Sequence, residues 1–165
     1  MKKQIIILIG LKGSGKTYVG SLLQEKLDIK FFRVENVWLS LKSDRLTNEY
    51  ILEGFGLVEQ EIDKLLLNTD RIIIESTGTT HYFSTFINRL KTKYDLILVN
   101  IQTSQELCLQ RVKSRDSSIH VPISDDIVKQ INQDALKVNL KYDIIIDNEK
   151  SSDDKILEDI QKVLN

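Results

Sequence analysis

A short run of glycine, lysine and threonine near the amino end of the chain has the spacing of a phosphate-binding loop. Residues 10–17 read GLKGSGKT, which fits the pattern Gly-x-x-x-x-Gly-Lys-Thr. Glycines in such a turn accept unusual backbone angles and let main-chain N–H groups face an anion. A helix that begins inside the motif adds unpaired N–H groups and the positive end of its dipole. The pattern therefore predicts a cradle for the phosphates of a nucleotide.

Individual residues of this loop have distinct expected roles. Lys16 is expected to reach the β- and γ-phosphates, and the Thr17 hydroxyl to bind Mg²⁺. The residues expected to bind the nucleotide are Gly10, Lys12, Gly13, Ser14, Gly15, Lys16 and Thr17.

Polar residues also follow later strand-like runs. Glu75 ends an apolar run, where a carboxylate is suited to hold Mg²⁺, although an ordinary polar strand end is the alternative. Glu35 is a candidate to bind or deprotonate an acceptor hydroxyl. Ser76, Thr77 and Gly78 are candidates to bind the acceptor, or else to cap the next helix.

Two arginines lie four residues apart near the end of a helical pattern. Arg111 and Arg115 share a helix face, and the polar stretch that follows contains the only proline, Pro122. We predict a lid over about residues 111–125 whose arginines stabilise charge on a transferring phosphoryl group. The alternative is that these cations only complement the helix dipole.

The elements that position these residues are visible as alternating patterns. Five β-like runs alternate with helical patterns, at residues 4–9, 30–34, 71–75, 96–101 and 143–147. This alternation predicts an α/β fold with a parallel sheet between two layers of helices. Ligands of such sheets bind beyond the carboxyl ends of the strands, where the polar residues above are expected.

Helix boundaries are indicated by capping signals. Thr103 and Glu106 have the spacing of a capping box, and Ser124 is a candidate N-cap. Residues 152–164 have the pattern of a terminal amphipathic helix. The pattern between residues 36 and 68 is weaker, and two or three helices are expected there.

Size and charge limit the class of protein. The chain has 165 residues, a formal net charge of -1 and one cysteine. These values predict a single domain over residues 1–165, in the cytoplasm, and disfavour nucleic acid or a membrane as partner. Within it, about residues 36–68 are expected to bind the acceptor.

With these motifs placed, the chain resembles the small P-loop kinases of the nucleoside-monophosphate-kinase-like superfamily. The likeness is to the shikimate and gluconate kinase branch and to the polynucleotide-kinase or zeta-toxin-like ATPases. The resemblance implies a three-layer P-loop fold with a five-stranded parallel sheet in the order 2-3-1-4-5 and a helical lid. It also implies ATP as donor, lid arginines at Arg111 and Arg115, and Asn148 near the adenine.

The segments after the second and third strands differ from those of shikimate kinases. Those enzymes carry Asp-x-Asp where this chain has Arg33-Val34-Glu35, and a triple glycine where it has Ser76-Thr77-Gly78. The run that begins at Glu75 looks more like the Asp-x-Thr-Asn or Asp-x-Thr-Gly segment of the polynucleotide-kinase-like group. The class of acceptor therefore stays open.

The leading hypothesis is an ATP- and Mg²⁺-dependent kinase that phosphorylates a hydroxyl of a small metabolite or nucleoside-like acceptor. In it, Lys16, Glu35, Arg111 and Arg115 are catalytic. Two alternatives are a nucleotide-dependent switch that phosphorylates no acceptor, and a kinase of nucleic-acid 5′ ends.

Overall fold

A computed structural model describes residues 2–41, 47–115 and 123–164. Pro122 and most of the predicted lid loop lie outside the described residues. The strands are β1 (Gln4–Ile9), β2 (Lys30–Phe31), β3 (Arg71–Ser76), β4 (Asp95–Gln102) and β5 (Ile144–Asp147). They form one parallel sheet in the order β2-β3-β1-β4-β5. The predicted fold class and strand order are confirmed.

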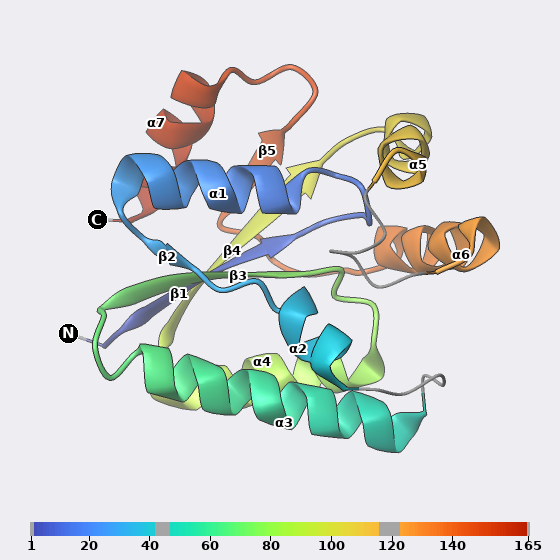
Figure 1. Cartoon of the computed structure of the whole chain (residues 1–165). Coiled ribbons are helices and arrows are strands. Elements are labelled where there is room, and N and C mark those ends of the chain that lie inside the picture. Colours follow the sequence, from blue (N-terminus) through green and yellow to red (C-terminus); the bar gives the residue numbers. More distant parts are fainter. Residues whose placement is uncertain (1, 42–46, 116–122, 165) are drawn as a thin grey trace.

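Helices lie on both faces of this sheet (Figure 1). The described helices are α1 (Lys16–Leu27), α2 (Glu35–Ser40), α3 (Asn48–Leu65), α4 (His81–Lys93), α5 (Gln105–Lys113), α6 (Asp125–Leu136) and α7 (Asp153–Val163). Helices α1 and α7 cover one face and α3 and α4 the other, while α5 and α6 lie beyond the carboxyl ends of the strands (Figure 1). None of the helices in the described part of the chain is long and apolar enough to cross a bilayer.

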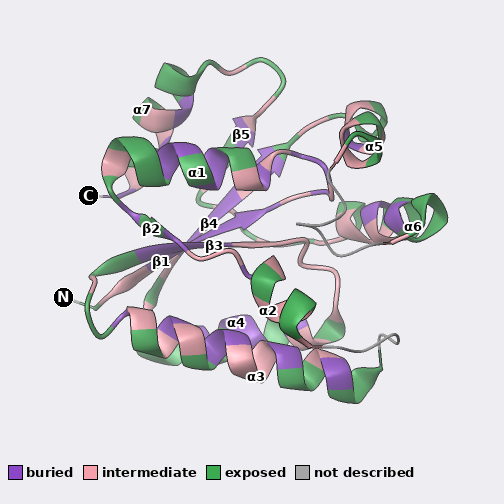
Figure 2. Cartoon of the chain, viewed as in Figure 1, coloured by how far each residue is buried: buried purple, intermediate pink, exposed green. Residues whose placement is uncertain are grey.

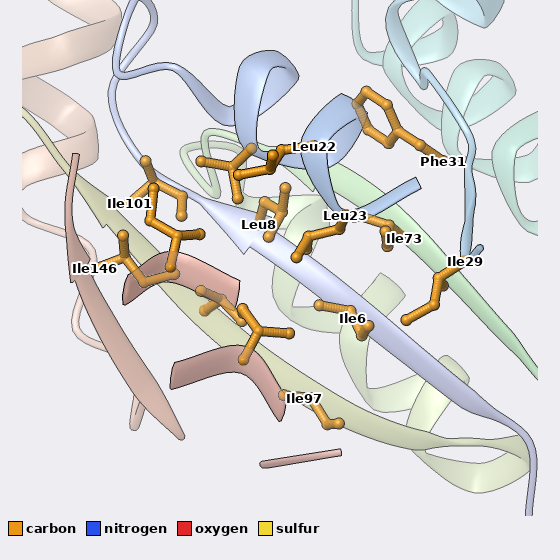
Figure 3. Packing of buried hydrophobic residues seen from close by; sticks show 14 of the residues in the cluster. Ile6, Leu8, Leu22, Leu23, Ile29, Phe31, Ile73, Ile97, Ile101 and Ile146 are labelled. Carbon is orange, nitrogen blue, oxygen red and sulfur yellow. The ribbon is translucent and has the colours of Figure 1, made fainter. Parts of the chain in front are cut away.

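Strand β1 is buried on both faces, as Figure 2 shows for the centre of the sheet. Because successive side chains of a strand point to opposite faces, Ile6 and Leu8 join the cluster formed with α1 and α7 (Figure 3). Ile5 and Ile7 join the cluster formed with α3 and α4. Each fully buried side chain of this size contributes about 1.5–3 kcal/mol. The loop that follows β1 therefore leaves from a firmly held strand end.

Strands β3, β4 and β5 differ from the predicted runs by one residue at one or both ends, and two local predictions fail more clearly. The predicted strand 30–34 ends at Phe31, because Val34 already has helical angles (φ -58, ψ -31) and caps α2. The predicted capping box of Thr103 is wrong: the N-cap of α5 is Ser104, which makes no side-chain cap bond. The Thr103 hydroxyl instead donates to the Ser14 carbonyl at 2.9 Å.

Other local predictions are confirmed. The Ser124 side chain accepts the N–H of Ile127 and caps α6. The terminal helix is α7, capped by Ser152. The described part of residues 36–68 holds two helices, α2 and α3.

Candidate active site

The phosphate-binding loop depends on glycines at two close approaches. Gly13 and Gly15 have φ of 95° and 93°, a region that side chains rarely adopt. A Cβ on Gly13 would lie 2.3 Å from the carbonyl oxygen of Cys108, and one on Gly15 would lie 2.1 Å from Nδ2 of Asn148. The loop is therefore pressed against α5 and against the segment that follows β5.

Side chains from distant elements hold the main chain of this loop. The Ser14 carbonyl accepts bonds from the Thr103 hydroxyl at 2.9 Å and from the Asn148 amide at 2.8 Å. Asn132 of α6 accepts the N–H of Lys12 at 2.7 Å and donates to its carbonyl at 3.1 Å. These bonds fix the loop from both sides.

Thr103 and Asn132 are site residues that the sequence analysis missed. Asn132 is 1% exposed and lies four residues after Val128, which is also buried. A polar residue on the apolar face of a helix was the available signal, because a buried amide needs hydrogen-bond partners. Its partner on the loop is 120 residues away in the sequence, and no local pattern identifies it.

Lys16 lies within the loop. Its ammonium group donates to the carbonyls of Gly10 at 2.9 Å and Leu11 at 2.7 Å. Burial lowers the pKa of Lys16 to about 8, and the negative charge of Glu75 opposes this shift. A phosphate group placed in the loop would supply the anion that this buried cation lacks.

The two residues predicted to bind Mg²⁺ are in contact. The Thr17 hydroxyl, in the first turn of α1, donates to Oε2 of Glu75 at 2.9 Å. Glu75 is opposite Leu8 in the β1–β3 register, so the adjacent strand delivers it beside the loop. A hydroxyl and a carboxylate are oxygen donors of the kind that Mg²⁺ prefers, so these residues fit the ion.

Glu35 begins α2 next to the loop. Its carboxylate is 3.6 Å from Nζ of Lys12 and 3.9 Å from Nη2 of Arg33, and the side chain is 15% exposed. Burial lowers the pKa of Lys12, while the charge of Glu35 raises it. The structure thus brings the Glu35 carboxylate, at the start of α2, to the phosphate-binding loop.

One cavity of about 700 Å³ connects these groups. Its polar end is lined by Lys12, Lys16, Thr17, Glu35 and Glu75. Ser76 and Thr77 also line it. Gly78 is absent from the lining and forms the turn that follows, with φ of 74°, where its N–H donates to the Ser76 hydroxyl at 3.0 Å.

The prediction that Arg111 and Arg115 share a helix face is wrong, because α5 ends at Lys113 and Arg115 lies beyond its C-cap. Arg115 lines the cavity. Arg111 is not in the lining: its Nη1 lies 3.5 Å from the Cβ position of Gly15 and is buried without a hydrogen-bond partner among the described residues. The amide of Asn148 is bonded to the loop. The roles of these residues toward a nucleotide stay predictions.

Comparison with known proteins finds a matching family, curated relatives and a solved structure with the same fold. Residues 6–141 match the family described as AAA domain. The chain is 26% identical to a shikimate kinase of Thermodesulfovibrio yellowstonii over 95% of this chain and 92% of that protein. It is 28% identical to a shikimate kinase of Flavobacterium psychrophilum over 99% of both chains. A putative kinase from Chloroflexus aurantiacus shares the fold, with a TM-score of 0.78, 15% identity and 100% coverage of each chain.

Proposed function

Since the chain belongs to the AAA domain family and is a small P-loop kinase, we propose that it transfers the γ-phosphoryl group of ATP to a hydroxyl of a small acceptor. The acceptor is a small metabolite or a nucleoside-like molecule, and Mg²⁺ is required. The observation that carries the proposal is the single cavity that contains Lys16, Thr17 and Glu75 at the loop together with Glu35 at the start of α2.

The loop and its neighbours hold the donor. The Lys16 ammonium binds the phosphates together with those main-chain N–H groups of residues 10–16 that are not bonded to Asn132, Ser76 or Leu11. Thr17 and Glu75, which are in contact, would hold Mg²⁺, and the ion would supply positive charge to the phosphate oxygens. Asn148 borders the adenine side of the loop.

Glu35 acts on the acceptor. The acceptor oxygen attacks the γ-phosphorus, the bond from that phosphorus to the β-phosphate oxygen breaks, and ADP leaves. The hydroxyl proton passes to the Glu35 carboxylate. Lys16, Arg111 and Arg115 stabilise the negative charge of the transferring group. Ser76 and Thr77 offer hydroxyls that orient the acceptor.

A coupled assay of ADP release against a panel of small alcohols tests this proposal. ADP release should depend on one acceptor, and the product should be its phosphate ester. Glu35→Gln should lower turnover by about 10²–10⁴-fold, because the proton acceptor is lost. The matched control is Glu53→Gln, an exposed residue of α3, which should leave turnover unchanged. ADP release that is independent of every acceptor, or unaffected by Glu35→Gln, contradicts the proposal.

A further inference from the structure

The cavity changes in character along its length. Charged groups gather at the phosphate-binding loop, whereas apolar and aromatic side chains of α2, α3 and α4 form the wall beyond Glu35. We propose that the acceptor carries its reacting hydroxyl on a molecule with a flat aromatic ring, for which a nucleoside is the model, and is not a polyhydroxylated acid. This inference deepens the proposed function and rests on it.

The aromatic wall is continuous. The ring centroid of Trp38 is 5.7 Å from that of Tyr50 and 5.6 Å from that of Phe55, the latter pair at 86°. Phe55 is in turn 5.0 Å from Phe86. Aromatic rings at these distances attract one another and offer faces and edges to a further ring.

This wall is poor in groups that bind a polyol. The Tyr50 hydroxyl already donates to the Trp38 carbonyl at 3.1 Å, and the other ring-borne polar group of the wall is the indole N–H of Trp38. Among the described lining residues, the cations Lys12, Lys16 and Arg115 come from the loop side, and none comes from α2, α3 or α4. A carboxylate or a set of hydroxyls buried against this wall would lose water without gaining partners.

Helix α6 also contributes apolar side chains to the cavity. Ile127 and Ile131 of α6 line the cavity, and Ile127 is 44% exposed although it lies on that lining. A ring between α6 and the aromatic wall would remove these side chains from water. The cavity volume of about 700 Å³ is in the range of sites for small molecules.

The single tryptophan reports on this wall directly. Trp38 is the only tryptophan of the chain, so its fluorescence can be followed while a compound is added in the presence of ADP and Mg²⁺. Adenosine and thymidine serve as ring-bearing probes, and shikimate and gluconate as polyhydroxylated acids. At least one nucleoside should change the emission saturably and stimulate ADP release from ATP. The acids at equal concentration should do neither.

Neighbouring residues of α3 provide matched variants. Ile51 lines the cavity, while Leu52 is 53% exposed and lies outside the lining. Ile51→Ser should raise the nucleoside Kd by about tenfold, whereas Leu52→Ser should leave it unchanged, and neither should alter ATP binding. Ile127→Ser provides the same test from α6 at a position that already tolerates water.

The outcomes separate the two proposals. Phosphorylation of an acid, with no binding of nucleosides, overturns this inference and leaves the proposed function standing. Equal Kd values for Ile51→Ser, Ile127→Ser and the parent protein also overturn the inference. ATP binding without stimulation of ADP release by these four compounds or by any member of the panel of small alcohols overturns the proposed function and the inference together.

Discussion

The phosphate-binding loop and the aromatic wall of the same cavity are built in opposite ways. The loop takes its main chain from one contiguous segment, residues 10–17, and its shape depends on two glycines with positive φ. The wall takes single side chains from α2, α3 and α4, among them Trp38 and Phe86. A function that depends on the main chain leaves a local pattern in the sequence, whereas one assembled from scattered side chains does not.

Loss of the buried cation should have the largest effect, and should be confined to the loop. Lys16→Ala should lower turnover by about 10²–10³-fold, because one charge that stabilises the transferring phosphoryl group is lost. Steady-state kinetics measure the effect. The circular dichroism spectrum and the melting temperature should stay close to those of the parent protein. The variant removes a charge whose burial is unfavourable, as the lowering of the Lys16 pKa to about 8 indicates. Unchanged turnover would contradict the role given to Lys16.

A substitution at Gly54 of α3 should change the aromatic wall and leave the phosphate-binding loop as it is. A Cβ there would lie 1.8 Å from Cζ3 of Trp38, so Gly54→Ala must displace the indole. We expect a shifted tryptophan emission, a roughly tenfold rise in acceptor KM and a loss of about 1–3 kcal/mol of stability. ATP binding should stay as it is. Gly56→Ala on the same helix is the control, because its Cβ would meet nothing within 4 Å.

A substitution at Asn132 tests whether the phosphate-binding loop depends on contacts from α6 in addition to its own residues 10–17. Asn132→Ala leaves the N–H and carbonyl of Lys12 without these partners, which should cost about 1–3 kcal/mol. The melting temperature should fall and the Kd for ATP should rise severalfold. Gln133→Ala, at the exposed neighbouring position, should change neither. If Asn132→Ala also behaves like the parent protein, the loop holds its shape without α6.

The smallest effect expected is a pH dependence of nucleotide binding. The pKa of Lys16 is about 8 in the free protein, so its positive charge is present below that pH and is lost as the pH rises through it. Affinity for ATP should fall severalfold between pH 7.5 and 9, and binding in this range should take up protons. Calorimetry in buffers of different ionisation enthalpy measures this uptake. In Lys16→Ala most of the pH dependence of ATP affinity should be lost. If the variant keeps a pH dependence of equal size, another group causes it.

Much of the fold is readable from short-range patterns. The apolar run 4–9 became β1 with the same bounds, and Ser124 caps α6 as its position indicates. The prediction was wrong where a tertiary contact overrode a local signal. The Thr103 hydroxyl fits a capping box, but it bonds the Ser14 carbonyl instead, because that carbonyl is brought beside it only in the folded chain.

The residues of the site also divide into those that a local sequence pattern indicates and those that it does not. The contact between Thr17 and Glu75 follows from a loop motif and a strand end, two features that topology places side by side. Asn132 and the aromatic wall were not found, because each depends on elements whose helical register must be known before their faces can be paired. Gly54 of α3 gives the space in which Trp38 lies, and this role depends on the packing of α2 against α3.

The only cysteine lies directly behind the phosphate-binding loop. Cys108 is fully buried, its carbonyl faces Gly13, and burial raises the pKa of its thiol. A soluble thiol reagent can react only when the packing around Cys108 opens locally. The rate at which Cys108 is labelled therefore reports how often the structure opens locally beside the phosphate-binding loop. A ligand that stabilises the loop should lower this rate.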